Sequence, residues 1–143
     1  MKQERVQDWM STELISAKLD TSLPEAHQIM VTSEIRRLPI VDQDGRLRGI
    51  VTLGDMRAAQ PSPATSLNIG ERNYLLANLT VERIMTPNPV TIHRQQSIGE
   101  AAQIMLDKRV SGLPVVDDNG RICGIITESD IFRMVVRHQW NRQ

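Results

Sequence analysis

Apolar residues recur along the chain at two different spacings, and these spacings predict its helices and strands. After Ser22 and again after Ser97, apolar residues return every three to four positions, as on one face of a helix. Each serine is followed three residues later by a glutamate, Glu25 or Glu100, which matches a capping box at a helix start. The sequence therefore predicts one helix beginning at each serine.

A continuous apolar run follows each predicted helix. Residues 38–42 read Leu-Pro-Ile-Val-Asp, and residues 113–117 read Leu-Pro-Val-Val-Asp. Each run leads into a turn-forming pair, Asp-Gly at Gly45 or Asn-Gly at Gly120, and then into a second apolar run. This arrangement is typical of a β-hairpin. We therefore expect two hairpins, whose returning strands cover 47–52 and 122–127.

Short apolar segments before the helices, at 14–15 and 89–92, predict two opening strands. A second helix is expected after each hairpin, near Asp55 and near Asp130, so that each predicted unit is β-α-β-β-α. The second of these helices places Ile131, Met134, Val135 and His138 on one face. Between the units, the Pro-rich residues 60–66 predict a loop and residues 69–79 predict a helix.

The two predicted units are copies of one sequence. A shift of 75 residues aligns positions 6–56 with positions 81–131 without a gap and gives 18 identities in 51. Chance would give about 3 identities for an ordinary composition. A repeat present twice favours a pseudo-twofold pair over an extended solenoid. We therefore predict an α+β fold with a first motif at 1–60, a linker with a short helix at 61–80, and a second motif at 81–143.

Composition and charge exclude several classes of protein. A chain of 143 residues suits one domain or two small units that share a core. Its 17 basic and 17 acidic side chains cancel, and aromatic residues make up 3%, which disfavours a nucleic-acid-binding module. Cys123 has no partner for an intrachain disulfide, and no signal peptide or membrane-spanning run is visible. We expect a cytoplasmic protein without nucleic-acid or membrane partners.

The repeated residues resemble a known family. Each copy carries Met-(Ser/Thr), Leu-Pro-(Ile/Val)-Val-Asp, Gly-Arg and Gly-Ile-(Val/Ile)-Thr-x-x-Asp in this order. This pattern, present twice, resembles a pair of CBS motifs, often called a Bateman module, and covers about 6–56 and 81–131. The resemblance implies two pseudo-symmetric clefts that bind adenosine-containing ligands, namely AMP, ADP, ATP or S-adenosylmethionine. It also implies a homodimer, and the linker is similar to that of small bacterial proteins of the acetoin-utilisation regulator type.

The segment that ends in Asp55 is the main candidate for ligand chemistry. A ribose offers two vicinal hydroxyls, and one short carboxylate can accept hydrogen bonds from both. Asp55 suits this role, and Thr52 can supply a hydroxyl to a phosphate or ribose oxygen. Asp130 and Thr127 repeat the arrangement. Each aspartate could instead act only as a helix cap, and the two roles can coexist.

Positive charge distinguishes the two candidate sites. The resemblance implies that basic residues just before the Leu-Pro strand face the phosphates, and Arg36 and Arg37 stand there in the first repeat. The second repeat has Ser111 and Gly112 instead, with Lys108 and Arg109 on the preceding helix end. We therefore expect a phosphate clamp in the Asp55 site and none in the Asp130 site, which would hold a less charged adenosine ligand or none. Lys108 and Arg109 could partly compensate for the missing arginines. Arg36 and Arg37 could also be merely solvated.

The resemblance further implies that the opening strand of one repeat walls the site of the other. It pairs Pro89 and Val90 with Asp55, and Leu14 and Ile15 with Asp130. Ile50 and Ile125 would line the two slots for the base, although any of these aliphatic residues could equally belong to the core.

No enzymatic motif is visible, because the chain lacks a nucleophile elbow, a phosphate-binding loop and a zinc signature. The histidines are far apart in the sequence and form no spaced metal motif. We therefore expect a ligand-sensing regulatory module that transmits ligand binding to an unknown effector protein through a dimer. The alternative is a ligand-free module for dimerisation or protein interaction.

Overall fold

The computed structural model describes residues 4–60 and 68–141, and it divides the chain into two compact units. One unit spans Ile15–Pro89 and contains Asp55, and we call it the Asp55 unit. The other combines Met1–Leu14 with Val90–Gln143 and contains Asp130, and we call it the Asp130 unit. Each unit therefore contains one complete hairpin of the repeat.

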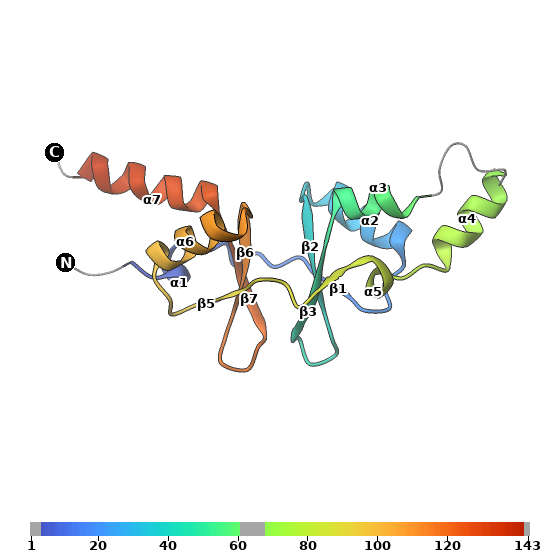
Figure 1. Cartoon of the computed structure of the whole chain (residues 1–143), viewed down its shortest axis with the longest axis horizontal. Coiled ribbons are helices and arrows are strands. Elements are labelled where there is room, and N and C mark those ends of the chain that lie inside the picture. The colour runs from blue at the N-terminus through green and yellow to red at the C-terminus, as the bar shows by residue number, and fades with distance from the viewer. Residues whose placement is uncertain (1–3, 61–67, 142–143) are drawn as a thin grey trace. The chain divides into compact units, whose positions relative to one another are not determined.

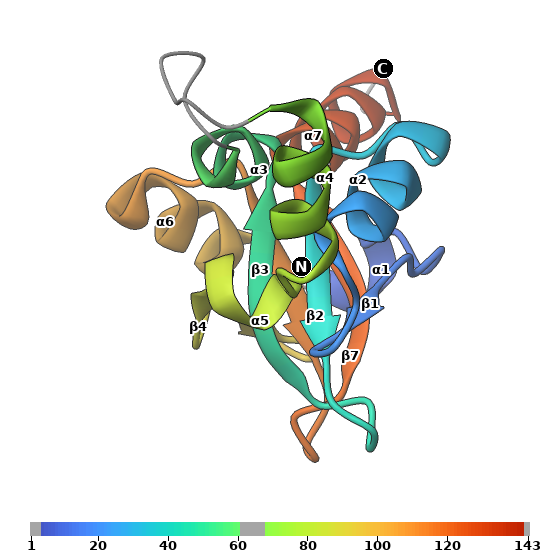
Figure 2. The same cartoon turned by 90° about the vertical axis from the view of Figure 1, so that its right-hand side faces the viewer.

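The Asp55 unit has a four-stranded sheet in the order β1-β2-β3-β4; β1, β2 and β3 are labelled in Figure 1, and β4 is labelled in Figure 2. Strand β1 is parallel to β2, and the pairs β2–β3 and β3–β4 are antiparallel. Helices α2, α3 and α4 lie over one face of this sheet (Figure 2). The elements of this unit are β1 (Ala17–Lys18), α2 (Leu23–Thr32), β2 (Arg37–Val41), β3 (Leu47–Thr52), α3 (Leu53–Ala59), α4 (Ile69–Ala77), α5 (Val81–Ile84) and β4 (Thr86–Pro87).

The Asp130 unit has a three-stranded sheet in the order β5-β6-β7, with β5 parallel to β6 and β6 antiparallel to β7. In place of a fourth strand, Ser11 forms an isolated bridge with Ile125. The elements of this unit are α1 (Val6–Trp9), β5 (Ile92–His93), α6 (Ile98–Lys108), β6 (Gly112–Val116), β7 (Ile122–Thr127) and α7 (Glu128–Asn141). The mixed α+β architecture confirms the predicted fold class.

The predicted helix starts and turns are confirmed in detail. Ser22 and Ser97 are N-caps whose hydroxyl oxygens accept the amides of Glu25 and Glu100. In the hairpins, Gly45 and Gly120 adopt φ values of 81° and 76°, the left-handed region that glycine enters at little cost. Before each turn, one aspartate, Asp42 or Asp117, accepts hydrogen bonds from the amides two and four residues later. These bonds fix the path of the loop.

Both opening strands lie later in the chain than predicted, and the strand expected at 89–92 shares only Ile92 with the observed strand. The opening strand expected at 14–15 is at Ala17–Lys18, where it pairs with Ile40 and Val41. Its counterpart β5, at Ile92–His93, is 75 residues further on and pairs with Val115 and Val116. Leu14 and Ile15 are the more hydrophobic pair, which is why the sequence predicted the strand there. In the structure, Ala17 pairs with Ile40 of the hairpin, and its short side chain is buried in the core. The loop predicted over 60–66 falls outside the described residues except for Gln60.

The segment that opens each sequence repeat belongs to the core of the other unit. Val6, which opens the first repeat, is fully buried among Ile92, Leu113 and Ile126 of the Asp130 unit. Val81, which opens the second repeat, is fully buried in the core of the Asp55 unit. A unit is therefore built from one repeat's hairpin and helices together with the other repeat's opening helix.

This exchange depends on glycine in each returning strand. A Cβ on Gly49 would collide with the side chain of Met85 and lie 2.9 Å from the backbone oxygen of Thr86. A Cβ on Gly124 would meet Met10 and lie 2.9 Å from the oxygen of Ser11. The opening segments therefore approach the hairpins as closely as glycine allows.

Replacing either of these strand glycines by alanine should weaken the fold. We expect Gly49→Ala and Gly124→Ala each to lower the free energy of unfolding by about 1–3 kcal/mol, the usual cost of overpacking. Gly99→Ala, in helix α6, is the control, because its new Cβ would lie 3.8 Å from the hydroxyl oxygen of Ser97, an ordinary contact distance. This substitution should be neutral or stabilising by about 0.5–1 kcal/mol. Urea unfolding would measure all three; equal effects of the three substitutions would contradict this packing.

Candidate functional site

Asp55 lies where β3 turns into α3. The amide of Thr52 donates to Asp55 Oδ2 at 2.9 Å, and the Thr52 hydroxyl oxygen accepts the amide of Asp55 at 3.1 Å. This reciprocal capping box satisfies two amides at the helix start. The box leaves the second carboxylate oxygen, Oδ1, without a hydrogen bond among residues 4–60 and 68–141. Asp55 therefore caps the helix and still presents one unused acceptor.

Arg36 and Arg37 lie beside this helix start. The register of β2 with β3 places Arg37 opposite Thr52, and the carbonyl of Arg36 accepts the amide of Leu53 at 3.2 Å. Arg36 is exposed and Arg37 is half-buried. The fold thus brings both arginines next to the Thr52–Asp55 junction.

The non-core face of the sheet carries several predicted site residues. Leu38 and Val51 point into the core and are fully buried. Since side chains alternate along a strand, Arg37, Ile50 and Thr52 lie on the opposite face. Ile50 pairs with Pro39 on one side and with Thr86 on the other. A polar helix start and an aliphatic strand residue therefore share this face.

Asp130 has the same backbone setting but different partners. The amide of Thr127 donates to Asp130 Oδ2 at 2.9 Å, and the Thr127 hydroxyl is 3.2 Å from the same oxygen. The guanidinium of Arg133 donates to Oδ1 at 2.6 Å. Asp130 is only 7% exposed. Both of its carboxylate oxygens are therefore already bonded within the unit.

Sequence reasoning missed this ion pair, although its signal was present. Arg133 follows Asp130 by three positions on a predicted helix, a spacing at which side chains are neighbours. The repeat aligns Arg133 with Ala58, so the first unit cannot form the same contact.

The backbone beside Asp130 lacks the arginine pair. Gly112 lies opposite Thr127 in the β6–β7 register, and the carbonyl of Ser111 accepts the amide of Glu128 at 3.0 Å. Arg109 ends α6 in the left-handed conformation, with φ of 56°, and its side chain is exposed. The two sites therefore differ in where their positive charges lie.

The four residues predicted to line the two sites from the opening strands are divided between the units, because the unit boundaries fall at 14/15 and 89/90. Ile15 and Pro89 belong to the Asp55 unit, and Ile15 packs against its core cluster. Leu14 and Val90 belong to the Asp130 unit and are both exposed. Ile125 is fixed by two backbone hydrogen bonds with Ser11, at 2.9 and 3.0 Å. The roles of these side chains toward a ligand remain predictions.

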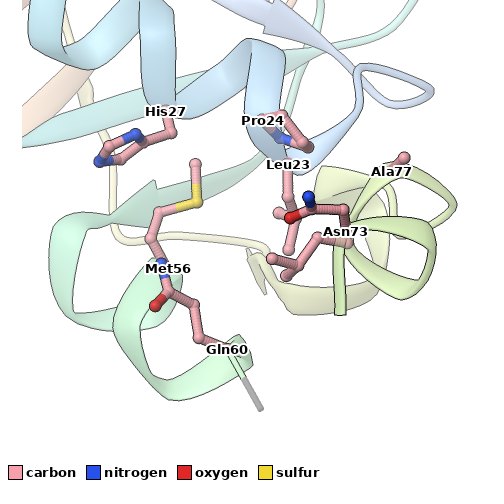
Figure 3. A pocket seen from close by; sticks show the side chains of 8 residues that line it. Leu23, Pro24, His27, Met56, Gln60, Asn73 and Ala77 are labelled. Carbon is pink, nitrogen blue, oxygen red and sulfur yellow. The ribbon is translucent and has the colours of Figure 1, made fainter. Parts of the chain in front are cut away.

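A hollow of about 450 Å³ lies among α2, α3 and α4, on the helical side of the Asp55 unit (Figure 3). The apolar side chains of Met56 and Leu76 and the polar side chains of His27 and Asn73 are among those that line it. Asp55 and the two arginines do not line it. This hollow is therefore separate from the candidate ligand site.

Three carboxyl groups of the described residues have pKa values below their ordinary values, and each accepts hydrogen bonds in a hairpin loop or at a helix start. The amide of Arg121 holds the pKa of Asp117 below its ordinary value, and the side chain of Gln96 does the same for Glu100. At Asp42, burial raises the pKa, but the amides of Arg46 and Asp44 and nearby arginine charge outweigh it. Among the described residues, no three potential ligands gather to hold a metal, and no helix is long and apolar enough to span a bilayer.

Comparison with known proteins agrees with the repeat. The family model of the CBS domain matches residues 6–62 and 81–137. A CBS domain-containing protein of Dictyostelium discoideum is 40% identical over 132 residues, which cover 92% of this chain and 91% of that protein. L-aspartate semialdehyde sulfurtransferase of Methanocaldococcus jannaschii is 36% identical over 129 residues, but these span only 23% of that enzyme.

Solved structures show the same fold. The CBS domain pair of protein MJ0100, crystallised with 5-methylthioadenosine and S-adenosylmethionine, is 34% identical with a TM-score of 0.76 over 96% of this chain and 99% of that one. CBSX2 in complex with AMP is 27% identical with a TM-score of 0.78, covering 95% and 98%. A Vibrio cholerae protein assigned to acetoin utilization is 26% identical with a TM-score of 0.80, covering 99% and 96%.

Cys123 lies in β7 and packs partly against the core of the Asp130 unit. Its thiol is 3.5 Å from the carbonyl oxygen of Val115. Burial, together with the charge of Asp117, raises the pKa of the Cys123 thiol above its ordinary value. Since the thiolate is the reactive form, this thiol should be unreactive at neutral pH.

Labelling with a disulfide reagent at pH 7.5 tests this expectation. We expect Cys123 in the folded protein to react about 10-fold more slowly, or slower still, than in the protein unfolded by guanidinium. The raised pKa also predicts that the labelling rate of the folded protein rises with pH over a higher pH range than that of the unfolded protein. Equal rates in the folded and unfolded protein at every pH would contradict a partly buried thiol with a raised pKa.

Proposed function

Because the chain belongs to the CBS domain family, we propose that it is a regulatory module that senses an adenosine-containing ligand. The observation that carries the proposal is the Asp55 junction, where the capping box fixes the carboxylate through one oxygen and the backbone of Arg36 and Arg37 adjoins the same helix start. Such a group accepts the hydroxyls of a ribose, while the guanidinium groups suit a phosphate on the same ligand.

Fixing Asp55 in advance favours binding. The capping box holds the side chain through the Thr52 amide, so little rotamer entropy is lost when a ribose hydroxyl bonds to Oδ1. Charged acceptors form the stronger class of hydrogen bond, each contributing about 1.5–3 kcal/mol. Ile50, on the same face as Thr52, offers an aliphatic contact for the base.

The neighbours narrow the class of ligand. The MJ0100 pair holds 5-methylthioadenosine and S-adenosylmethionine, and CBSX2 holds AMP. These ligands share an adenosine and differ in the group attached to its 5′ carbon. For this chain we propose AMP, ADP, ATP or S-adenosylmethionine, and a nucleotide ligand would make the protein a sensor of cellular energy state in the cytoplasm.

Transmission of the signal requires a second protein surface. On α7 of the Asp130 unit, Phe132 and Val136 lie one turn apart and are 64% and 61% exposed. Leu106, on the adjacent helix α6, is also exposed. We propose that this apolar face forms a homodimer, whose arrangement the ligand biases and an effector protein recognises. Such a shift requires that the ligand bind the two arrangements with different affinities.

A ligand-free interaction module is the second candidate. Its support is that Asp55 and Asp130 both bond the amide of the threonine three residues before them, a structural role that is complete without a ligand. In that case Asp55→Ala would lower the free energy of unfolding by about 1 kcal/mol, as other lost caps do, and would change no affinity.

Calorimetric titration with the four ligands tests the first candidate. We expect the wild type to bind at least one of them and Asp55→Ala to bind it about 10- to 100-fold more weakly, because a hydrogen bond to a charged group is lost. Arg36→Gln should weaken AMP, ADP and ATP about 10-fold but leave S-adenosylmethionine, which has no phosphate, less affected.

Arg83→Gln is the matched control for this charge change. Arg83 is also exposed and belongs to the same unit, but it lies on α5. It should leave all four affinities unchanged. If the wild type binds none of the four ligands, the nucleotide-sensing proposal is wrong.

The dimer has a test of its own. We expect the double substitution Phe132→Glu and Val136→Glu to convert a wild-type dimer into a monomer in analytical ultracentrifugation, because two charges would be buried in the interface. The control places two glutamates at Ile69 and Tyr74, which are exposed on α4 of the other unit, and should remain dimeric. A wild type that sediments as a monomer at micromolar concentration would contradict the dimer.

A further inference from the structure

The two candidate carboxylates occupy equivalent positions of the repeat but differ in what remains open to a ligand. At Asp55, Oδ2 accepts the Thr52 amide and Oδ1 has no partner in the described part of the chain. At Asp130, Oδ2 accepts hydrogen bonds from both the amide and the hydroxyl of Thr127. Its other oxygen, Oδ1, accepts a hydrogen bond from the guanidinium of Arg133 at 2.6 Å. A ribose therefore meets an open acceptor in one unit and a closed one in the other.

The two threonine hydroxyls differ in the same sense. The hydroxyl oxygen of Thr52 accepts the Asp55 amide, which leaves its proton available to a ligand. The hydroxyl of Thr127 is 3.2 Å from Asp130 Oδ2, so its proton is directed at the carboxylate. The Asp130 junction thus satisfies its own groups, whereas the Asp55 junction leaves one donor and one acceptor unused by residues 4–60 and 68–141.

The position of Arg133 allows it to block access of a ligand to the Asp130 carboxylate. Its side chain is 62% exposed, while that of Asp130 is 9% exposed, so the guanidinium covers the carboxylate from the solvent side. The bond joins two opposite charges, whereas a ribose hydroxyl offers only a neutral donor. A ligand that binds Asp130 must first displace this arginine.

From this difference we propose that Arg133 is a selectivity residue that makes the Asp130 site the weaker of two ribose sites. The protein then binds one adenosine-containing ligand per chain, at Asp55, over the concentration range in which that site fills. This inference rests on the proposed function, since it ranks two sites for the same class of ligand. It assigns to Arg133 the role of an internal competitor for the Asp130 carboxylate.

The repeat supplies reciprocal variants. Arg133→Ala gives the second unit the residue that the first unit has at Ala58. Ala58→Arg places an arginine on the exposed surface of α3, three positions after Asp55. It should create in the first unit an ion pair equivalent to that of Arg133 with Asp130. Asp55→Asn removes the strong site, so that the second site can be measured alone. Arg137→Ala is the control, because it removes the same charge from α7, where Arg137 stacks on Trp9.

Isothermal titration of AMP, with ADP, ATP and S-adenosylmethionine in parallel, measures both affinity and stoichiometry. We expect one ligand per wild-type chain. Asp55→Asn combined with Arg133→Ala should bind about 10-fold more tightly than Asp55→Asn alone, whereas the combination with Arg137→Ala should not. Ala58→Arg should weaken the wild-type site about 10-fold.

Two other outcomes separate this inference from the proposed function. If the wild type binds two equal ligands per chain, or if Arg133→Ala leaves the second site unchanged or weaker, the role of Arg133 is wrong and the sensing function stands. If neither the wild type nor any variant binds one of the four ligands, both proposals are wrong.

Discussion

Packing of each repeat's opening segment on the other repeat's hairpin is the constraint on which the rest of the structure depends. Val6 and Val81 complete the cores of units whose remaining core residues come mainly from the opposite repeat. The close approach at Gly49 and Gly124 fixes the same segments along the returning strands. Because the exchange is mutual, each core is completed only by a segment of the other repeat.

This packing also sets the geometry of the candidate sites. The returning strands β3 and β7, held between the first strand of the hairpin and the opening segment, end at Thr52 and Thr127. Each threonine then begins a helix, and the aspartate three residues on bonds back to its amide. The same hydrogen bond that starts the helix orients the carboxylate. Structure and ligand chemistry therefore share one side chain, which explains why capping and binding need not be alternatives.

Much of this arrangement follows from the sequence because it depends on local signals. The capping serines, the Asp-Gly and Asn-Gly turns and the Thr-x-x-Asp junctions each act within a few residues, and the 75-residue offset doubles every signal. The exchange of Val6 and Val81 was not predictable in this way, because periodicity shows that a residue is buried and not which partner buries it. The predicted position of the first opening strand was wrong because pairing with β2, which periodicity does not show, places this strand at Ala17–Lys18. Arg133 and Asp130 stand at helical spacing in the sequence, but this spacing alone does not show that the two side chains pair.

A crystal structure of the protein grown with whichever of AMP, ADP, ATP and S-adenosylmethionine binds most tightly tests the central claim most directly. We expect a ribose whose hydroxyls contact the Asp55 carboxylate, with Arg36 or Arg37 near the group attached to the 5′ carbon. We also expect Arg133 to remain bonded to Asp130. A ligand bound at Asp130, with Asp55 left as a simple helix cap, would contradict the assignment of the ribose site to Asp55.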